Sequence, residues 1–298
     1  MMNGLHPELV ETISRKLKNS RTFDQLIMHR TFVHFSEQNY QLENCLIEEI
    51  MIRSIRVICI QPKNAAKNMQ CFLWLHGGGM VFGSPDDSVP YVTDFVHKFQ
   101  AMVFIPQYRL APEHPYPAAL NDGYETFIWI HEHARDLNID PNKIIVSGGS
   151  AGGNLAFAIA LKARDENGPK IAAILPLYPM LDAKERPFHK KFTLPAIWND
   201  EKNRKSWLAY LPDTQNIPHY ASPFYANVEG LPPVYTFIGT HDLFFEEVCE
   251  FIDKLKQAHV QIQFDIYQGC THGFDLEEIP IAREAKKRLL DVTSKLLE

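Results

Sequence analysis

The segment IIVSGGSAG, residues 144–152, narrows the fold of this chain more than any other feature. A short run of β-branched residues ends in the pattern G-x-S-x-G, and an alanine-rich segment with helical spacing begins at Ala151. A serine at the turn between a strand and a helix is typical of a nucleophile whose hydroxyl must stay accessible. Glycine at positions 148 and 152 lets the strand and the helix approach closely. We therefore predict a strand–turn–helix unit that presents Ser150 as a nucleophile.

Short apolar runs alternate with longer segments of helical spacing along most of the chain. The expected strands are residues 46–60 (with alternation over 53–60), 71–75, 101–106, 143–147, 172–177, 234–239 and 263–267. The expected helices are residues 5–40 (one or two amphipathic helices), 87–99, 117–134, 151–164, 246–258 and 281–297. Strands that alternate with helices favour a mostly parallel sheet with helices on both faces.

Residues 183–222 interrupt this alternation, because they are rich in aromatic residues, charges and proline and contain no clear strand. A loop of this length in a compact domain is usually functional or disordered. We expect an insertion of short helices that packs with the N-terminal helices as a cap. The alternative is a long connecting loop without a function. The predicted organisation is residues 1–45 as N-terminal helices of the cap, 46–182 as the first part of the α/β core, 183–222 as the cap insertion and 223–298 as the second part of the core.

Two further side chains complete a candidate catalytic triad with the serine. Asp242 in VYTFIGTHDLFFEE and His272 in FDIYQGCTHGF each follow a predicted strand. The carboxyl ends of parallel strands build the sites of such sheets, and the order serine, acid, histidine is a known order for a triad. We expect His272 to act as base and then acid toward Ser150, and Asp242 to orient the imidazole. Glu246 and Glu247 are competing acids, but they fall inside the next predicted helix.

Three consecutive glycines, Gly77 to Gly79, follow the apolar run that ends at Leu75 and His76. Attack on a carbonyl creates an oxyanion, and one fixed N–H donor stabilises it by about 3 kcal/mol. Glycines let the backbone approach the substrate with no side chain in the way. We therefore predict that the N–H groups of Gly78, Gly79 and Ala151 form an oxyanion hole.

The overall composition excludes several classes of protein. The 298 residues carry a net charge of -6 with dispersed charges, so no nucleic-acid surface is expected. The longest apolar run, residues 171–181, is too short to span a bilayer, and the N-terminus lacks the apolar core of a signal peptide. The five cysteines are scattered, and neither a CxxC pair nor an HExxH motif is present. We expect a cytoplasmic protein without a metal, a nucleic-acid partner or stable membrane insertion.

The substrate pocket is expected between the cap and the glycine-rich loop. Its candidate lining residues are Met80 and Phe82 beside the loop and Phe188, Phe192 and Trp198 in the cap. The alternative is that these side chains only attach the cap to the core. No large exposed apolar lid is evident, so short acyl chains, from acetyl to butyryl, are expected.

Taken together, these residues resemble the hormone-sensitive lipase-like group of α/β-hydrolase carboxylesterases. The matching stretches, in order, are His76-Gly77-Gly78-Gly79, YRLAPEHPYPAALND (108–122), SGGSAGGN (147–154), LYPMLD (177–182), Asp242 in GTHDLFFEE, and His272-Gly273-Phe274. The resemblance implies an α/β-hydrolase fold, with an eight-stranded, mostly parallel sheet under a helical cap. It also implies hydrolysis of short- to medium-chain acyl esters without a cofactor, on the triad and oxyanion donors named above. Dimers are common in the family, so a homodimer is an open option.

Three positions depart from the pattern of that family. Gly149 stands where an aspartate or threonine usually precedes the nucleophile, and Gln107 stands where the residue before YRLAPE is usually acidic. The usual Asp-Pro-Leu at the acid is Asp242-Leu243-Phe244 here. Every chemical role stays filled, so the departures bear on rate and specificity rather than on the reaction.

The sequence therefore predicts a serine carboxylesterase that hydrolyses short-chain acyl esters through an acyl-enzyme intermediate. Two alternatives stay open. The same triad could serve an amidase, a deacetylase or a small peptidase, since the sequence does not show how a leaving amine would be protonated. The second alternative is a non-catalytic protein that binds a small molecule. Some plant hormone receptors have this fold but lack the catalytic histidine, so the presence of His272 counts against this alternative.

Overall fold

One eight-stranded sheet organises the chain, of which the computed structural model describes residues 4–28, 42–194, 196–213 and 215–296. Its order is β1-β2-β4-β3-β5-β6-β7-β8. The strands are β1 (Cys45–Ile52), β2 (Ile55–Pro62), β3 (Met69–Leu75), β4 (Met102–Pro106), β5 (Ile139–Gly149), β6 (Ala173–Leu177), β7 (Val234–His241) and β8 (Ile262–Thr271). The β1–β2 and β2–β4 pairs are antiparallel and the others are parallel, so the predicted, mostly parallel sheet is confirmed.

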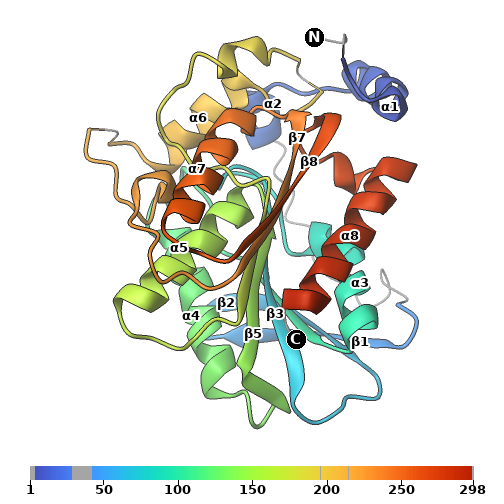
Figure 1. The fold of residues 1–298 in the computed structure, drawn as a ribbon, viewed down its shortest axis with the longest axis vertical. Helices are drawn as coiled ribbons and strands as arrows, with labels where there is room; N and C mark the ends of the chain where they lie inside the picture. Colours follow the sequence, from blue (N-terminus) through green and yellow to red (C-terminus); the bar gives the residue numbers. More distant parts are fainter. Residues whose placement is uncertain (1–3, 29–41, 195, 214, 297–298) are drawn as a thin grey trace.

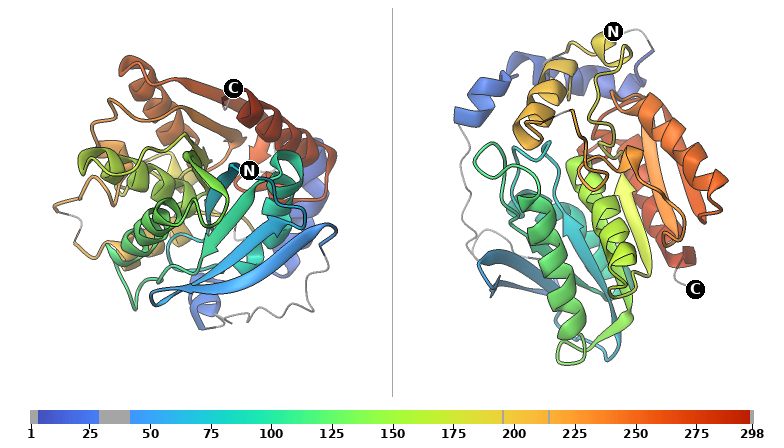
Figure 2. Two further views of the ribbon diagram at one scale, coloured as in Figure 1. Left: turned by 90° about the horizontal axis from the view of Figure 1, so that it is seen from below. Right: turned by 90° about the vertical axis from the view of Figure 1, so that its left-hand side faces the viewer.

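Helices cover both faces of this sheet, as predicted. They are α1 (Pro7–Lys18), α2 (Phe23–Met28), α3 (Val89–Phe99), α4 (Ala118–Glu132), α5 (Ala151–Asp165), α6 (Asp200–Tyr210), α7 (Phe245–Gln257) and α8 (Pro280–Leu296). Figure 1 shows α3 and α8 on one face and α4, α5 and α7 on the other, and Figure 2 shows the same layers from two further sides. Parallel neighbours require crossover connections, and helices supply them here.

Helix α5 is buried along almost its whole length, from Ala151 to Leu161 and again at Ala163. Alanine and glycine make up much of this helix, so it lies close to β5 and β6. Phe157 of α5 meets Phe251 of α7 edge to face, with the ring centroids 5.0 Å apart. A helix that is apolar on all sides is stable only where other elements cover it. The packing therefore holds the start of α5, directly after Ser150, in a fixed position.

The segment between β6 and β7 contains α6, which lies at the same end of the molecule as α1 and α2 (Figure 1). Lys205 of α6 pairs with Asp24 of α2 at 3.1 Å. Phe23 of α2 packs edge to face on Phe82, which follows the glycine-rich loop, at 5.2 Å between centroids. These contacts agree with a cap formed by the two segments, whose domain boundaries at 45, 182 and 222 stay a prediction.

Several elements differ in length from their predictions. β5 begins four residues early at Ile139, and β8 continues beyond Tyr267 to Thr271. The extension of β8 carries Gly269 and Cys270 through a register shift in its pairing with β7, and this irregularity hides the strand from an apolar pattern. The part of the N-terminal helical prediction that covers residues 29–40 lies outside the described residues.

Two observations concern the environment of the protein. Within the described ranges, the helices include none that is both long enough and apolar enough to cross a membrane. All five cysteines are free. The cytoplasmic location expected from the sequence stays a prediction.

Phe157→Ala is expected to lower the free energy of unfolding by about 3–5 kcal/mol, because the loss of a buried phenyl ring leaves a cavity between α5 and α7. Urea unfolding followed by circular dichroism measures this change. Leu208→Ala, at a side chain that is 56% exposed, is the matched control and should change stability by less than about 0.5 kcal/mol. A cost for Phe157→Ala as small as that of the control would contradict the packing.

Candidate active site

The strand registers bring the predicted triad residues to one end of the sheet. In the parallel pair β7–β8, His241 lies opposite Thr271, so the residues that follow them, Asp242 and His272, leave the sheet side by side. Ser150 follows the last residue of β5, which lies on the other side of β6. Three separate strands thus deliver a serine, a carboxylate and an imidazole to the same place.

These three side chains form a continuous hydrogen-bonded chain. His272 Nδ1 lies 2.8 Å from Asp242 Oδ2, and His272 Nε2 lies 2.9 Å from Ser150 Oγ. A carboxylate only accepts hydrogen bonds, so Nδ1 carries the proton and donates to Asp242. Nε2 is then free to accept from the Ser150 hydroxyl. Asp242 is fully buried, and its other oxygen accepts from the N–H of Phe244 at 2.9 Å.

The turn that carries Ser150 is tightly constrained. Ser150 has φ 58° and ψ -116°, a conformation that a non-glycine residue adopts only under strain. A Cβ at Gly148 or Gly152 would lie 2.4 or 1.9 Å from the carbonyl oxygen of Leu75, at the end of β3. Only glycine permits this approach. The close packing of β3 against the turn places the loop after β3 next to Ser150.

The glycine-rich loop holds its main chain in conformations that favour glycine. Gly78 and Gly79 have φ of +116° and +62°. In the described part of the chain, no acceptor takes a hydrogen bond from the main-chain N–H of Gly78, Gly79 or Ala151. These are the three donors that the sequence analysis assigned to an oxyanion hole, and their role stays a prediction.

His76 and Tyr108 fix the base of this loop. Their rings stack at 4.0 Å with an interplanar angle of 10°. The Tyr108 hydroxyl donates to the His76 carbonyl oxygen at 2.7 Å, and His76 Nδ1 lies 2.8 Å from the carbonyl oxygen of Gly77. Burial lowers the pKa of His76 to about 4, although its contact with Gly77 opposes the shift. The ring is therefore neutral at pH 7 and supports the loop without adding a charge.

The structure explains two of the three departures of the sequence from the family pattern, those at Gly149 and Gln107. A Cβ at Gly149 would lie 3.0 Å from the hydroxyl of Tyr178, so the Tyr178 ring fills the space of a side chain at position 149. Gln107 Oε1 accepts from the Arg56 guanidinium at 3.2 Å, and Asp86 pairs with the same guanidinium at 2.9 Å. A neutral residue at position 107 thus keeps the contact, because Asp86 supplies the negative charge.

A cavity of about 270 Å³ opens beside Ser150 and His272. Trp198, predicted as a pocket residue, lines it, and its ring lies 6.3 Å from that of His272. Besides the glycine-rich loop and the turn at Ser150, the wall includes residues that were not predicted for the pocket: Trp74, Asp87, Ser88, Tyr91, Tyr178, Gly273 and Leu276. They come from the end of β3, the start of α3 and the segments after β6 and β8. They are far apart in the sequence, and no motif links them to the pocket.

The other four predicted pocket residues do not line this cavity. Met80 is fully buried, and Phe82 packs against Phe23 of α2. Phe188 and Phe192 pack against each other, with ring centroids 5.1 Å apart. These contacts are those expected of residues that attach the cap to the core, and a contact of any of the four with substrate stays a prediction.

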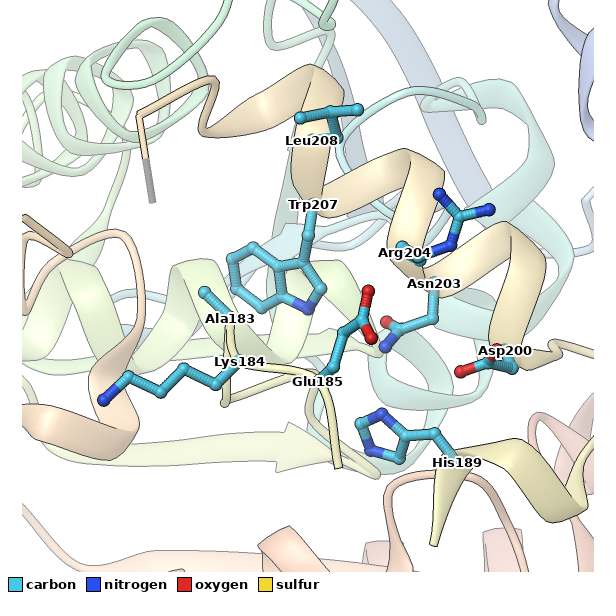
Figure 3. Close-up of a pocket in the computed structure, with 9 residues that line it drawn as sticks. All are labelled: Ala183, Lys184, Glu185, His189, Asp200, Asn203, Arg204, Trp207 and Leu208. Carbon is cyan, nitrogen blue, oxygen red and sulfur yellow. The ribbon is translucent and has the colours of Figure 1, made fainter. Parts of the chain in front are cut away.

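A second cavity, of about 350 Å³, lies between α6 and the segment that follows β6 (Figure 3). Its lining residues are Ala183, Lys184, Glu185, His189, Asp200, Asn203, Arg204, Trp207 and Leu208. It shares no residue with the cavity beside Ser150. The candidate chemistry therefore belongs to the smaller cavity.

No cofactor is expected from the sequence, and the residues of this site contain no arrangement that calls for one. In the ranges that the structure describes, no three His, Cys, Asp or Glu residues are grouped so that they could hold a metal ion.

Comparisons with known proteins place this geometry among esterases. A family profile described as "alpha/beta hydrolase fold" matches residues 72–276. The carboxylesterase NlhH of Mycobacterium tuberculosis is 32% identical over 246 residues, which cover 79% of this chain and 76% of that protein. The esterase LipI of M. tuberculosis is 34% identical over 224 residues, covering 72% of this chain and 69% of that protein. The solved structure of a bacterial heroin esterase superposes with a TM-score of 0.90 at 28% identity, over 100% of this chain and 99% of that one.

Gly149→Ala is expected to lower the free energy of unfolding by about 1–3 kcal/mol, because the added methyl group overpacks against Tyr178. In a Tyr178→Phe background the same substitution should cost less, since the nearest contact, the Tyr178 hydroxyl, is absent. Urea unfolding of the four proteins gives the coupling between the two sites. Strictly additive costs would show that Tyr178 does not determine the need for glycine.

Proposed function

Because the chain belongs to the α/β-hydrolase fold family and, like its named relatives, is a carboxylesterase, we propose that it hydrolyses short-chain acyl esters through an acyl-enzyme on Ser150. The hydrogen-bonded chain from Ser150 through His272 to Asp242, with distances of 2.9 and 2.8 Å, carries this proposal. It supplies a nucleophile, a base within reach of its proton and an acid that orients the base.

In the first half of the reaction, His272 Nε2 takes the proton of Ser150 Oγ as the oxygen attacks the ester carbonyl carbon. Asp242 keeps the imidazole in the tautomer that leaves Nε2 unprotonated, and it stabilises the imidazolium that forms. The tetrahedral intermediate then collapses as His272 returns the proton to the leaving alkoxide. An alcohol departs, and the acyl group stays on Ser150.

The second half repeats these roles with water. His272 takes a proton from a water molecule, the resulting hydroxide attacks the acyl carbonyl, and the proton passes to Ser150 Oγ as the carboxylic acid leaves. Asp242 is fully buried. Water therefore does not compete with it for the proton on His272 Nδ1. One histidine therefore serves as base and acid twice per turnover.

The N–H groups of Gly78, Gly79 and Ala151 are proposed to bind the oxyanion in both halves. Their freedom from other acceptors in the described residues supports this role. Donors that are fixed before the reaction need no reorganisation when charge develops, which is why such holes contribute about 3 kcal/mol per donor. The stacked pair of His76 and Tyr108 keeps the loop in place during the reaction.

The related proteins that are named esterases favour an ester over an amide substrate, and no contact in the site favours the amide. The cavity of about 270 Å³ beside Ser150 is the space proposed for the substrate. Much of its wall consists of three aromatic rings, those of Trp74, Tyr91 and Trp198. Each ring packs against another side chain, so the wall is rigid.

Ser150→Ala is expected to reduce kcat by at least about 1,000-fold, since only binding and the oxyanion donors remain. Turnover of p-nitrophenyl butyrate by the purified variant measures the loss. Ser147→Ala, three residues earlier on β5, removes a hydroxyl that donates only to the Leu73 carbonyl oxygen at 3.2 Å, and it should retain most of the activity. Substantial activity in Ser150→Ala would refute the acyl-enzyme.

The acyl-chain preference should peak at two to four carbons, as expected for an esterase without a large exposed apolar lid. A series of p-nitrophenyl esters from acetate to decanoate, compared by kcat/KM, measures the preference. Leu276→Ala, at a side chain on the cavity rim that is 60% exposed, should shift the maximum toward longer chains. A maximum at ten or more carbons in the wild-type protein would rule out the proposed limit.

A further inference from the structure

The cavity beside Ser150 has one carboxylate and no lysine or arginine to balance it. Among its described lining residues there is no lysine or arginine, and Asp87 is the one acidic residue. His76, which also lines it, is neutral at pH 7 because burial lowers its pKa to about 4. The charged side chains that line this cavity therefore carry a net negative charge.

Asp87 is exposed to solvent at the edge of the cavity, where two hydrogen bonds hold its carboxylate. Its Oδ2 accepts from the main-chain N–H of Ser84 at 2.9 Å and from the Ser84 hydroxyl at 3.0 Å. Both bonds come from the turn that follows the glycine-rich loop, and they leave the other oxygen, Oδ1, without a hydrogen bond to any described residue. The carboxylate is close enough to His76 to act on its charge, which places the negative field beside the loop.

The rest of the wall is aromatic. Trp74, Tyr91, Tyr178 and Trp198 line the same cavity as Asp87. Aromatic faces attract organic cations, most strongly where water is excluded. One of these rings already binds a cation that lies outside the cavity. The ammonium of Lys286 on α8 lies over the Tyr91 ring, 4.9 Å from its centroid. Lys286 does not line the cavity, so the other three rings remain available to a ligand.

We propose that this cavity selects esters that carry an ammonium group, and that Asp87 is the residue that confers the preference. The proposal rests on the proposed function, of which it names the substrate class. A carboxylate beside an oxyanion hole opposes the negative charge of the transition state. A substrate that brings its own positive charge offsets this repulsion and gains contacts with Asp87 and the aromatic rings, so the preference appears in kcat/KM.

The test uses pairs of esters that have the same shape and differ only in charge. Butyrylcholine is compared with 3,3-dimethylbutyl butyrate, in which carbon replaces the quaternary nitrogen of the alcohol. The p-nitrophenyl ester of 4-(trimethylammonio)butanoate is compared with p-nitrophenyl 5,5-dimethylhexanoate, which places the charge in the acyl group. In at least one pair the cationic ester should have a kcat/KM about 10-fold higher, a ratio that one ion contact with cation–π support provides. The pair that shows it identifies which side of the ester occupies the cavity.

Asp87→Asn keeps an oxygen that can accept from Ser84 but removes the charge, and it should reduce this ratio to between about 1 and 3. Asp94→Asn removes an exposed carboxylate from α3 outside the cavity and should leave the ratio unchanged. Equal kcat/KM values within both pairs, or a ratio that survives Asp87→Asn, would overturn the inference. Ser150-dependent turnover of the neutral esters reports the proposed function separately, so the two failures are distinguishable.

Discussion

The close approach of the end of β3 to the turn between β5 and α5 is the constraint on which the site depends. The carbonyl oxygen of Leu75 occupies the space that a Cβ at Gly148 or Gly152 would need. Because of this approach, the glycine-rich loop at the end of β3 lies directly beside Ser150, which follows the neighbouring strand β5. The proposed oxyanion donors and the proposed nucleophile are thus positioned by backbone packing, and neither position depends on a flexible side chain. Electrostatic stabilisation of a transition state requires this kind of fixed geometry.

The cap reaches the same loop from the other direction. A Cβ at Gly79 would lie 2.5 Å from the ring of Trp198 and 2.7 Å from the hydroxyl of Ser206 on α6. Trp198 also approaches His272 and lines the cavity, so one cap residue contacts the loop, faces the histidine and shapes the space for substrate. Substrate preference and the geometry of the loop are therefore linked through the cap, and changes in α6 should affect both.

The sequence predicts the chemistry of this site better than its shape. Ser150, Asp242 and His272 could be found because each follows an apolar run, and the resemblance that they suggested is confirmed by the family match to residues 72–276. The pocket residues could not be found in this way. Tyr91 lies in the helix predicted over residues 87–99, and only the packing of α3 beside β3 brings it to the cavity. Asp87 is exposed, and only its place beside the cavity distinguishes it from other surface aspartates.

The central claim is that His272 activates Ser150. Incubation with a fluorophosphonate at neutral pH, followed by intact mass measurement and peptide mapping, tests it most directly. The account predicts stoichiometric labelling at Ser150 and loss of labelling in His272→Ala, with the folded state of the variant confirmed by circular dichroism. Labelling at another residue, or a folded wild-type protein that does not react, would contradict the account.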